Sequence, residues 1–391
     1  MNKEFDHPLF KLFKFHSPTR LVFGLGSRAT LPKEVSKYGK NVLLVSDAFI
    51  KEIYSELVDI LTDSGLDVEL YNKIKGEPSL ETVNDALSYA KEKKPDVVVG
   101  VGGGSTMDTA KIIAAKFTNE IPIEEMIGVD NVPNKAIPLI LLPTTAGTGS
   151  EINRTAMLII DGAKKWIMSE NIAARVAIVD PELTVTCPPR VTAFTGMDAL
   201  AHAIEGYMSV DANCIVDALA LEVSRLVNKY LVRSYSNGKD IEARYYMSLA
   251  ATMAGLILCS TGAVYAHSVS YTLVRYGVPH GLGVGFALPY AMEINLPVIP
   301  EKLARLAESF EVKEGGIRDK ALAVISAVRR ISKDVNIPKS LKDMDVPKED
   351  LKMLAKELIE KYPRRNNPRF LTYEDATRLY EAMWNGESII Y

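Results

Sequence analysis

The sequence predicts an α/β domain with a mainly parallel sheet, followed by a domain made only of helices. Up to about residue 187, short strand-like runs alternate with helical patterns, which is typical of βαβ units whose sheet is covered on both faces. Beyond the adjacent prolines of "CPPR" (187–190), the strand-like runs stop and one helical pattern follows another. We therefore place the two domains at 1–187 and 188–391.

Each domain shows its elements in chain order. The first domain has expected strands at 41–46, 68–71, 96–101 and 137–143, and expected helices beginning near Ala48, Ser79 and Ser105. The second has helical patterns at about 195–208, 213–232, 240–260, 301–310, 319–332, 348–361 and 373–384.

Composition excludes several classes of protein. The 391 residues are 47% hydrophobic, enough for sizeable cores, and a net charge of -3 gives no basic excess for binding nucleic acid. No apolar run approaches the roughly 20 residues that span a bilayer, and charges are scattered through the N-terminal "MNKEFDHPLFKLFKF". Three cysteines without CxxC spacing predict neither disulfides nor a thiolate metal site. We expect a cytoplasmic protein without nucleic-acid or membrane partners.

A glycine-rich loop follows the expected strand at 96–101. "VVVGVGGGSTMDTAK" (97–111) enters a helix at "STMD", where Ser105 and Asp108 predict a capping box. Glycines allow close backbone approach, and free N–H groups at a helix start favour an anion. The loop therefore predicts a pyrophosphate cradle or, alternatively, a tight turn without ligand. A rival is "GLGSRA" (24–29), which has the G-x-G-x-x-A form after strand-like "TRLVF".

Two other features of this domain suit a nucleotide. Asp47 ends the expected strand at 41–46, where a carboxylate would bind a ribose diol and repel a 2′-phosphate, or would cap a helix. "PTTAGTGSE" (143–151) brings threonine hydroxyls and bare backbone after a buried strand, and fits a polar ligand or a plain surface loop.

The helical domain holds a possible metal site. Asp198 and His202 lie four apart inside the apolar pattern "TGMDALAHAIEGY", so they share one helix face. Burying an unpaired carboxylate costs several kcal/mol, a cost that a divalent cation bound by one oxygen and three imidazoles would offset. His267, on an apolar helical pattern, and His280, expected in an exposed turn, could complete the set. Hydrogen-bonded structural histidines are the alternative.

Six motifs carry a resemblance to a known family. They are "GGGSTMDTAK", "PTTAGTGSE", "VAIVDPELT", "TAFTGMDALAHAIEGYMS", "VPHG" and "NNPR". In order and spacing the chain resembles the iron-containing (group III) alcohol dehydrogenases over nearly its whole length. The resemblance implies an N-terminal Rossmann-like domain and an all-helical C-terminal domain, the fold also found in dehydroquinate synthases. It implies NAD and a divalent metal, Fe²⁺ or else Zn²⁺, facing each other in the cleft.

The resemblance also implies roles for individual residues. The four metal ligands would be Asp198, His202, His267 and His280. Asp47 would bind the ribose and favour NAD over NADP, and "GLGSRA" becomes a structural turn. The residues that would hold the pyrophosphate or line the nucleotide are Gly103, Gly104, Ser105, Thr144, Thr145, Lys165 and Leu183.

Departures from the family pattern cluster at the substrate end. Where many relatives read A-F-S-N-A-G, this chain reads "ILCSTG" (257–262), so Leu258 and Ser260 replace a phenylalanine and an asparagine. Tyr271 stands where relatives often have a second histidine, and we assign it a proton relay. The resemblance therefore predicts the metal site but does not predict which alcohol is the substrate.

The resemblance implies a metal-dependent, NAD(H)-linked oxidoreductase that interconverts a primary alcohol, or a small diol, and its aldehyde. The metal would polarise the reacting oxygen. We expect a small-molecule alcohol or aldehyde substrate and a homo-oligomer, namely a dimer. Alternatives are a polyol dehydrogenase or a hydroxyacid-oxoacid transhydrogenase of the same superfamily, a dehydroquinate synthase-like lyase, which Asp198 argues against, and a scaffold without turnover.

Overall fold

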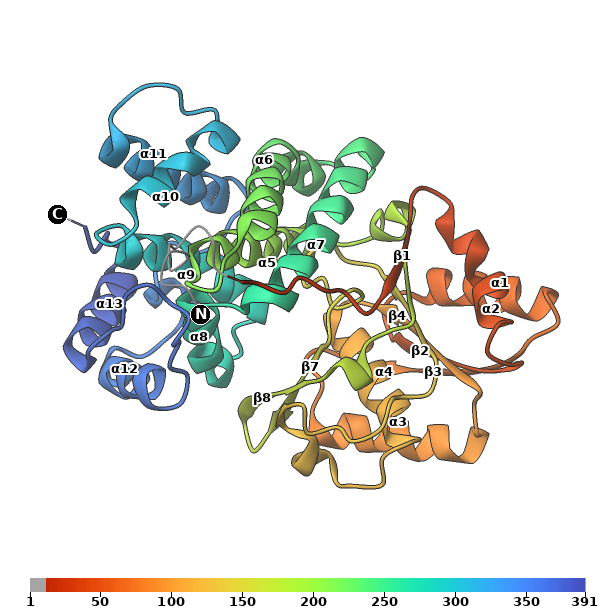
Figure 1. Cartoon of the computed structure of the whole chain (residues 1–391). Helices are drawn as coiled ribbons and strands as arrows, with labels where there is room; N and C mark the ends of the chain where they lie inside the picture. The colour runs from red at the N-terminus through yellow and green to blue at the C-terminus, as the bar shows by residue number, and fades with distance from the viewer. Residues whose placement is uncertain (1–11, 391) are drawn as a thin grey trace, which may run out of the picture.

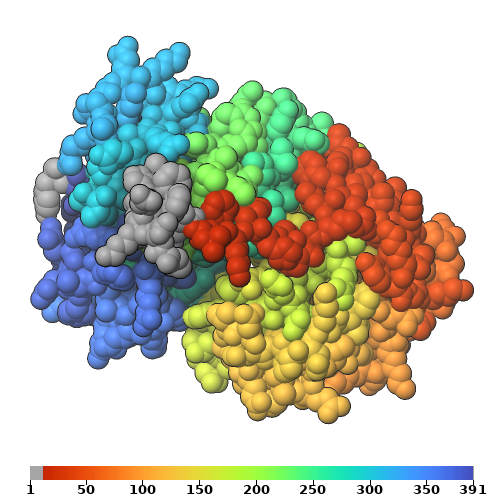
Figure 2. Space-filling model, in the orientation of Figure 1, coloured from red at the N-terminus to blue at the C-terminus, as the bar shows by residue number. Residues whose placement is uncertain are grey.

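The computed structural model describes residues 12–390 and has two parts of different make-up (Figure 1). Within the described residues, strands occur from β1 (Arg20–Phe23) to β9 (Val176–Val179), and the part that begins at α5 (Pro189–Met208) is helical. The predicted fold class is confirmed. The segment before β1 crosses from the helical part to the sheet (Figures 1 and 2). Most of the N-terminal charges that argue against a signal peptide lie in residues 1–11, outside the described residues.

A six-stranded parallel sheet forms the first part, in the order β1-β9-β6-β4-β2-β3. The strands not yet named are β2 (Asn41–Asp47), β3 (Asp67–Ile74), β4 (Val97–Gly102) and β6 (Leu139–Pro143). Because β6, β4 and β2 are neighbours and parallel, the loops that follow them share the carboxyl edge of the sheet, where open α/β sheets bind ligands. The sheet thereby brings Asp47, the glycine loop and the threonine loop to one edge.

Helices cover both faces of this sheet. Its helices are α1 (Leu31–Val35), α2 (Lys51–Asp63), α3 (Leu80–Lys93) and α4 (Gly104–Lys116). Alternate residues of β2 point to opposite sides: Leu43 packs in the core with α3 and α4, and Leu44 packs in the core with α1 and α2. This two-sided burial explains why the strands read as continuous apolar runs.

The sequence analysis missed a β-hairpin in this part. β7 (Thr155–Ile160) and β8 (Ala163–Met168) pair in antiparallel fashion, and β5 (Gly128–Val129) lies beside β8. Asp161 and Gly162 join β7 to β8 with φ of 51° and 70°. An Asp-Gly turn with two positive φ values is the commonest hairpin connection. The sequence therefore did contain the signal.

The second part is built around α5, which packs against α6, α7 and α9. Its other helices are α6 (Cys214–Ser236), α7 (Ile241–Thr261), α8 (Tyr265–Leu273), α9 (His280–Asn295), α10 (Pro300–Arg305), α11 (Ile317–Asp334), α12 (Leu351–Glu360) and α13 (Tyr373–Asn385). Among residues 12–390, no single helix is both long and apolar enough to cross a membrane.

The position of His280 corrects an expectation. His280 does not lie in an exposed turn but is the half-buried first residue of α9. This helix is absent from the expected set because almost every residue after Gly281 is buried. A helix that is buried all round shows no polar face, so its sequence lacks the 3.6-residue period.

Close glycine contacts hold the threonine loop against the helical part. Gly149, at φ 57°, meets Gly255 of α7 so closely that a Cβ on Gly149 would lie 2.4 Å from the Gly255 Cα. A Cβ on Gly255 would lie 2.5 Å from Ile152 Cγ2 and 2.7 Å from the Gly149 carbonyl oxygen. A Cβ on Gly147 would lie 2.6 Å from the carbonyl oxygen of Thr195, three residues before Asp198. The loop therefore docks directly on α5 and α7.

We predict that Gly255→Ala lowers stability by about 1–3 kcal/mol, because overpacking against backbone outweighs the roughly 1 kcal/mol by which alanine favours a helix. Thermal unfolding followed by circular dichroism measures the effect. Gly316→Ala is the control, since its φ of -71° suits alanine and a Cβ there would make only an ordinary contact with Asp319 Oδ2 at 3.5 Å. An unchanged or higher midpoint for Gly255→Ala would contradict the close contact.

Candidate metal and nucleotide site

Helix α5 carries three buried polar side chains on one face. Asp198, His202 and Glu205 follow one another at spacings of four and three, so they lie on successive turns. Their exposed fractions are only 1%, 5% and 0%. Polar groups buried this deeply need partners.

His267 of α8 lies between the two carboxylates of α5. Its Nδ1 pairs with the Glu205 carboxylate, which also accepts the Ala266 N–H at 2.6 Å. Its Nε2 lies 3.5 Å from Asp198 Oδ1, and its ring stacks on His202 with 4.7 Å between centroids. Glu205 therefore orients the imidazole so that Nε2 points toward Asp198. The sequence analysis missed Glu205, although it lies seven residues after Asp198 on the same apolar helix.

The donor atoms of Asp198, His202 and His267 fit a divalent cation. One donor from each lies within 4.8 Å of the others. Asp198 Oδ1 is 3.7 Å from His202 Nε2 and 3.5 Å from His267 Nε2. Ligands at about 2.1 Å from a tetrahedral cation are about 3.4 Å apart. Asp198 Oδ1 and His267 Nε2 are also buried and have no hydrogen-bond partner among residues 12–390, and a cation between them would supply one.

His280 stands beside these three side chains. Its ring centroid lies 5.3 Å from that of His267. The Ser270 hydroxyl donates to the His280 carbonyl oxygen at 2.9 Å and lies 3.0 Å from His280 Nδ1. Since a hydroxyl has one proton, this arrangement favours Nδ1–H as the donor to Ser270 and leaves a lone pair on Nε2. His280 can therefore approach a cation held by the other three.

The charges of this cluster are strongly coupled. Burial alone would raise the pKa of Asp198, but His202, His267 and His280 hold it below its ordinary value. Burial alone would lower the pKa of His267, but Glu205 and Asp198 raise it to about 10. Burial lowers the pKa values of His202 and His280. A protonated His267 thus balances two buried carboxylates when no cation is bound, and a cation must displace its Nε2 proton.

The start of α4 is open to an anion. Gly103 is its N-cap residue, and within the described part of the chain no side chain caps the first N–H groups of Gly104 and Ser105. The expected capping box is wrong. Asp108 instead accepts bonds from Ser150 Oγ at 2.6 Å and from the Met157 N–H at 2.9 Å.

Asp108 faces inward because of a buried lysine. Lys111 is 0% exposed, and its Nζ lies 3.6 Å from Asp108 Oδ1. The same Nζ donates to Ser150 Oγ, Asn153 Oδ1 and the Thr155 carbonyl oxygen at 2.8, 3.1 and 2.6 Å. A buried ammonium requires an acidic partner, and Asp108 provides it. This network joins α4 to the threonine loop and leaves the amides at the start of α4 free.

Asp47 uses one oxygen in its own turn. Its Oδ1 accepts the Phe49 N–H at 2.9 Å, and its Oδ2 would lie 3.0 Å from a Cβ on Gly102. Because α2 begins at Lys51, Asp47 caps the turn before the helix rather than the helix itself. Burial raises the pKa of Asp47. Its second oxygen faces the glycine loop, where a ribose could meet it.

The threonine loop lies beside the glycine loop. The Thr144 N–H donates to the Gly102 carbonyl oxygen at 3.0 Å. Thr145 Oγ1 is buried, has no hydrogen-bond partner in the segment that the structure describes, and would lie 3.6 Å from a Cβ on Gly103. Leu183 differs from these two, because it is 3% exposed and packs in the core with α2.

Two neighbouring lysines of β8 have different surroundings. Lys165 pairs opposite Leu158, whose side chain is in the core of the first part. Lys164 points to the other face, is 3% exposed, forms an ion pair with Glu77 at 2.8 Å and lies 6.0 Å from the Tyr271 ring centre. The structure thus brings Lys164, rather than Lys165, close to the histidine cluster. Because successive side chains of a strand point to opposite faces, the sequence predicts that Lys164 and Lys165 point in opposite directions. It does not show which of the two faces the site.

"GLGSRA" is tied to another segment. The Gly26 N–H donates to Asp180 Oδ1 at 3.1 Å, and Arg28 forms an ion pair with Asp180 at 2.8 Å. These bonds fix the turn after β1 against the residues that follow β9. They give this segment a structural role in the described residues.

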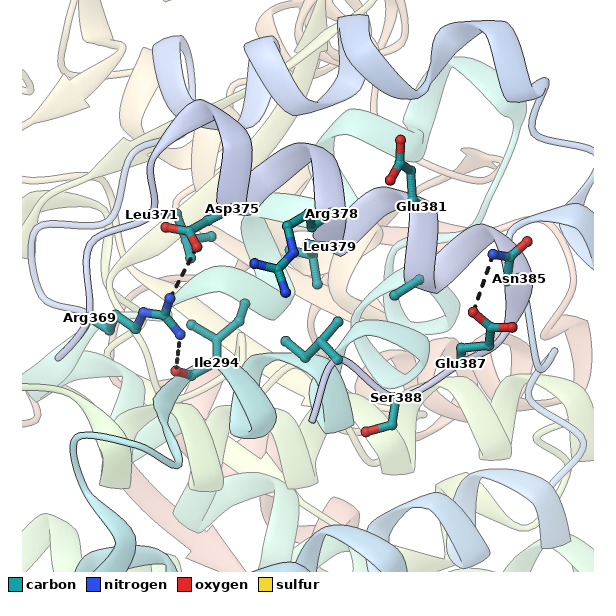
Figure 3. A pocket seen from close by; sticks show the side chains of 12 residues that line it. Ile294, Arg369, Leu371, Asp375, Arg378, Leu379, Glu381, Asn385, Glu387 and Ser388 are labelled. Carbon is teal, nitrogen blue, oxygen red and sulfur yellow. Dashed lines mark hydrogen bonds and ion pairs between the residues drawn. The ribbon is translucent and has the colours of Figure 1, made fainter. Parts of the chain in front are cut away.

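A pocket of about 330 Å³ lies elsewhere, beside α9 and α13 (Figure 3). Arg369, at its edge, donates to the Ile294 carbonyl oxygen at 3.3 Å and to Asp375 at 3.1 Å. Asp198 and the three histidines His202, His267 and His280 do not line this pocket. The candidate site is therefore identified by its buried donor atoms, Asp198 Oδ1 and His267 Nε2, and not by this pocket.

Comparison with known families covers almost the whole chain. Residues 18–181 match the family described as iron-containing alcohol dehydrogenase, and residues 192–384 match the C-terminal part of the Fe-containing alcohol dehydrogenase family.

Individual relatives agree with this. The chain is 35% identical over 374 residues to an NAD-dependent methanol dehydrogenase of Bacillus methanolicus, covering 93% of this chain and 98% of the relative. It is 33% identical over 389 residues to long-chain-alcohol dehydrogenase 1 of Geobacillus thermodenitrificans, covering 95% and 98%. The solved structure of an alcohol dehydrogenase from Oenococcus oeni is similar with a TM-score of 0.91 at 31% identity, over 95% of this chain and 100% of that one. This chain belongs to the iron-containing alcohol dehydrogenase family.

Proposed function

We propose that this oxidoreductase interconverts primary alcohols and aldehydes at the cluster of Asp198, His202, His267 and His280, with NAD as hydride carrier. The observation that carries the proposal is the set of buried donor atoms of Asp198, His202 and His267, which lie within 4.8 Å of one another on a chain of this family. Two of these atoms have no hydrogen-bond partner within residues 12–390. The methanol dehydrogenase relative is described as NAD-dependent, which supports the choice of coenzyme. The location in the cytoplasm and the dimeric state stay predictions of the sequence.

The donor set indicates what the bound groups would contribute. A divalent cation held by these four side chains, Fe²⁺ or Zn²⁺, would polarise the alcohol or carbonyl oxygen, and NAD in the cleft would supply or accept the hydride. The protein orients the reactants and excludes water. The start of α4, Asp47 and the threonine loop are proposed to hold the coenzyme, and burial of the cluster keeps its electrostatic interactions strong.

Tyr271 is proposed to relay the proton. Its half-buried ring stacks on His280 with centroids 5.7 Å apart and planes inclined by 17°. It lies one turn beyond His267 on α8 and is partly exposed. A phenol in that position can pass a proton outward without a separate buried base.

Removing a ligand should remove the metal. We predict that His267→Ala loses stoichiometric metal and lowers kcat/KM by at least about 100-fold, because the cation loses a direct ligand. Glu205→Gln should weaken metal binding by about 10–100-fold through loss of the carboxylate that orients His267. Elemental analysis and metal titration measure both. His16→Ala, at an exposed histidine, is the control, and full metal content in His267→Ala would refute the ligand set.

The coenzyme preference should depend on Asp47. We predict that the wild type has a higher kcat/KM with NAD than with NADP. Asp47→Gly should reduce this difference, because a carboxylate no longer repels the 2′-phosphate of NADP. Asp47→Asn keeps an acceptor for the Phe49 N–H and should also reduce the difference in kcat/KM between the two coenzymes. This variant therefore distinguishes an effect of the Asp47 charge from an effect of the turn that Asp47 stabilises. Steady-state kcat/KM for the two coenzymes gives the answer. A wild-type preference for NADP would show that Asp47 only stabilises its turn.

Substrate size is proposed to follow from the end of α7. Leu258 and Ser260 are half-buried in its last turns, in place of the larger residues of many relatives. The smaller side chains leave apolar room and remove an amide that could orient a second hydroxyl. Added apolar contact contributes about 1–3 kcal/mol per methylene. Relatives of similar identity are named for methanol and for long-chain alcohols, so overall identity does not decide substrate length.

We predict higher kcat/KM for primary alcohols of about four carbons or more than for 1,2-propanediol or glycerol, because the site gains apolar contact and lacks a partner for the second hydroxyl. A series of ethanol, butanol, hexanol, 1,2-propanediol and glycerol, under one metal and one pH, measures the order. A vicinal diol or glycerol at the top would instead favour a polyol dehydrogenase.

A further inference from the structure

Ser270 of α8 contacts both the backbone and the ring of His280. Its hydroxyl donates to the His280 carbonyl oxygen at 2.9 Å, and the same oxygen atom lies 3.0 Å from His280 Nδ1. Because the single proton of the hydroxyl is used at the carbonyl oxygen, the hydroxyl oxygen can accept a hydrogen bond from Nδ1–H. Ser270 is 0% exposed, which shields its side of both bonds from water. These two bonds hold the ring in one orientation relative to its own backbone.

His280 needs such a restraint more than the other proposed ligands do. Asp198, His202 and His267 are at most 5% exposed, whereas His280 is half-buried and is the first residue of α9. A fully buried side chain is held by many packing contacts, and a half-buried one by fewer. The hydrogen bond to Ser270 is therefore a main restraint on the orientation of the His280 ring.

The close packing of α8 on α9 brings the Ser270 hydroxyl to this position. A Cβ on Gly283, three residues after His280 in α9, would lie 2.9 Å from Ser270 Oγ and 3.2 Å from Ser270 Cα. Glycine at 283 thus leaves room for the hydroxyl. Tyr271 stacks on the His280 ring with centroids 5.7 Å apart. Since Tyr271 covers one face of the ring and Ser270 binds Nδ1, Nε2 is the ring nitrogen left for a cation.

His267 and His280 are held in similar ways by different partners. Nδ1 of His267 pairs with the Glu205 carboxylate, and Nδ1 of His280 pairs with the Ser270 hydroxyl. Metal-binding histidines commonly use their second ring nitrogen in this way, and loss of the partner weakens metal binding by about 10–100-fold. Hydrogen bonds to a charged group are stronger than those between neutral groups. Ser270 should therefore contribute less to metal binding than Glu205 does.

Resting on the proposed function, we infer that Ser270 is a positioning residue that fixes the orientation and the Nδ1–H tautomer of His280, so that Nε2 faces the cation site. Ser270 acts only through His280. Without the hydroxyl, the ring can turn about its Cβ–Cγ bond, and either nitrogen can carry the proton. A ligand that has the right orientation for only a fraction of the time binds with its affinity reduced by that fraction.

Metal affinity tests this role without turnover. Competition with a chelator measures the dissociation constant of the full chain for Zn²⁺ and, under anaerobic conditions, for Fe²⁺. We expect Ser270→Ala to weaken the binding of both ions by about 10-fold, at the lower end of the range for such partners. Ser268→Ala is the matched control, because Ser268 is also 0% exposed on α8 but donates to the Tyr362 carbonyl oxygen. This control should leave the metal affinity unchanged.

The tautomer of His280 is a second readout, which a purely structural role of Ser270 would not change. NMR of isotope-labelled histidine rings distinguishes the two tautomers at about pH 8, where an unperturbed histidine is neutral. The chain has five histidines, and the signals missing in His280→Gln assign those of His280. We expect the Nδ1–H tautomer alone in the metal-free wild type and in Ser268→Ala. Ser270→Ala should show a mixture of both tautomers.

The inference would be overturned by a metal affinity of Ser270→Ala equal to that of the wild type. An equal loss of affinity in Ser268→Ala, or a single unchanged tautomer of His280 in Ser270→Ala, would overturn it as well. A wild type that binds metal but oxidises no primary alcohol would instead refute the proposed function. That result would leave the role of Ser270 intact, because neither measurement uses turnover.

Discussion

The candidate site depends on two carboxylates buried on one face of α5. Asp198 and Glu205 lie on either side of His267, and both are almost completely removed from solvent. Charges buried in this way are unfavourable unless a positive charge lies between them. A protonated His267 can supply that charge when the site holds no cation, and a divalent cation supplies it otherwise. The same constraint explains why an apolar helix contains an aspartate, a histidine and a glutamate.

The second requirement is that the two parts of the chain meet at this helix. The parallel sheet brings Asp47, the start of α4 and the threonine loop to one edge. Gly147 and Gly149 then let that loop touch α5 and α7 without intervening side chains. Lys111, with its buried partner Asp108, ties the loop to α4. Thus backbone contacts and one buried ionic network hold the glycine loop close to the buried side chains of Asp198, His202 and His267.

Several parts of this arrangement could be predicted from the sequence, and the failures have physical causes. The four-residue spacing of Asp198 and His202 predicted a shared face, and apolar runs located β2, β4 and β6. Helix α9 was missed because burial on all sides removes periodicity. Asp108 was misassigned because its partner, Lys111, is recognised as buried only in three dimensions. Glu205 and Lys164 were missed because their roles depend on which neighbour each side chain meets across the fold.

The most direct test of the account is the position of a bound metal. Anomalous X-ray scattering, recorded at the metal absorption edge from crystals of the Fe²⁺-loaded protein, would locate the ion without assuming its ligands. We expect one strong peak about 2.0–2.2 Å from Asp198 Oδ1 and from the Nε2 atoms of His202, His267 and His280. A stoichiometric metal peak at any other position, with Asp198 and His267 still 3.5 Å apart and nothing between them, would contradict the account.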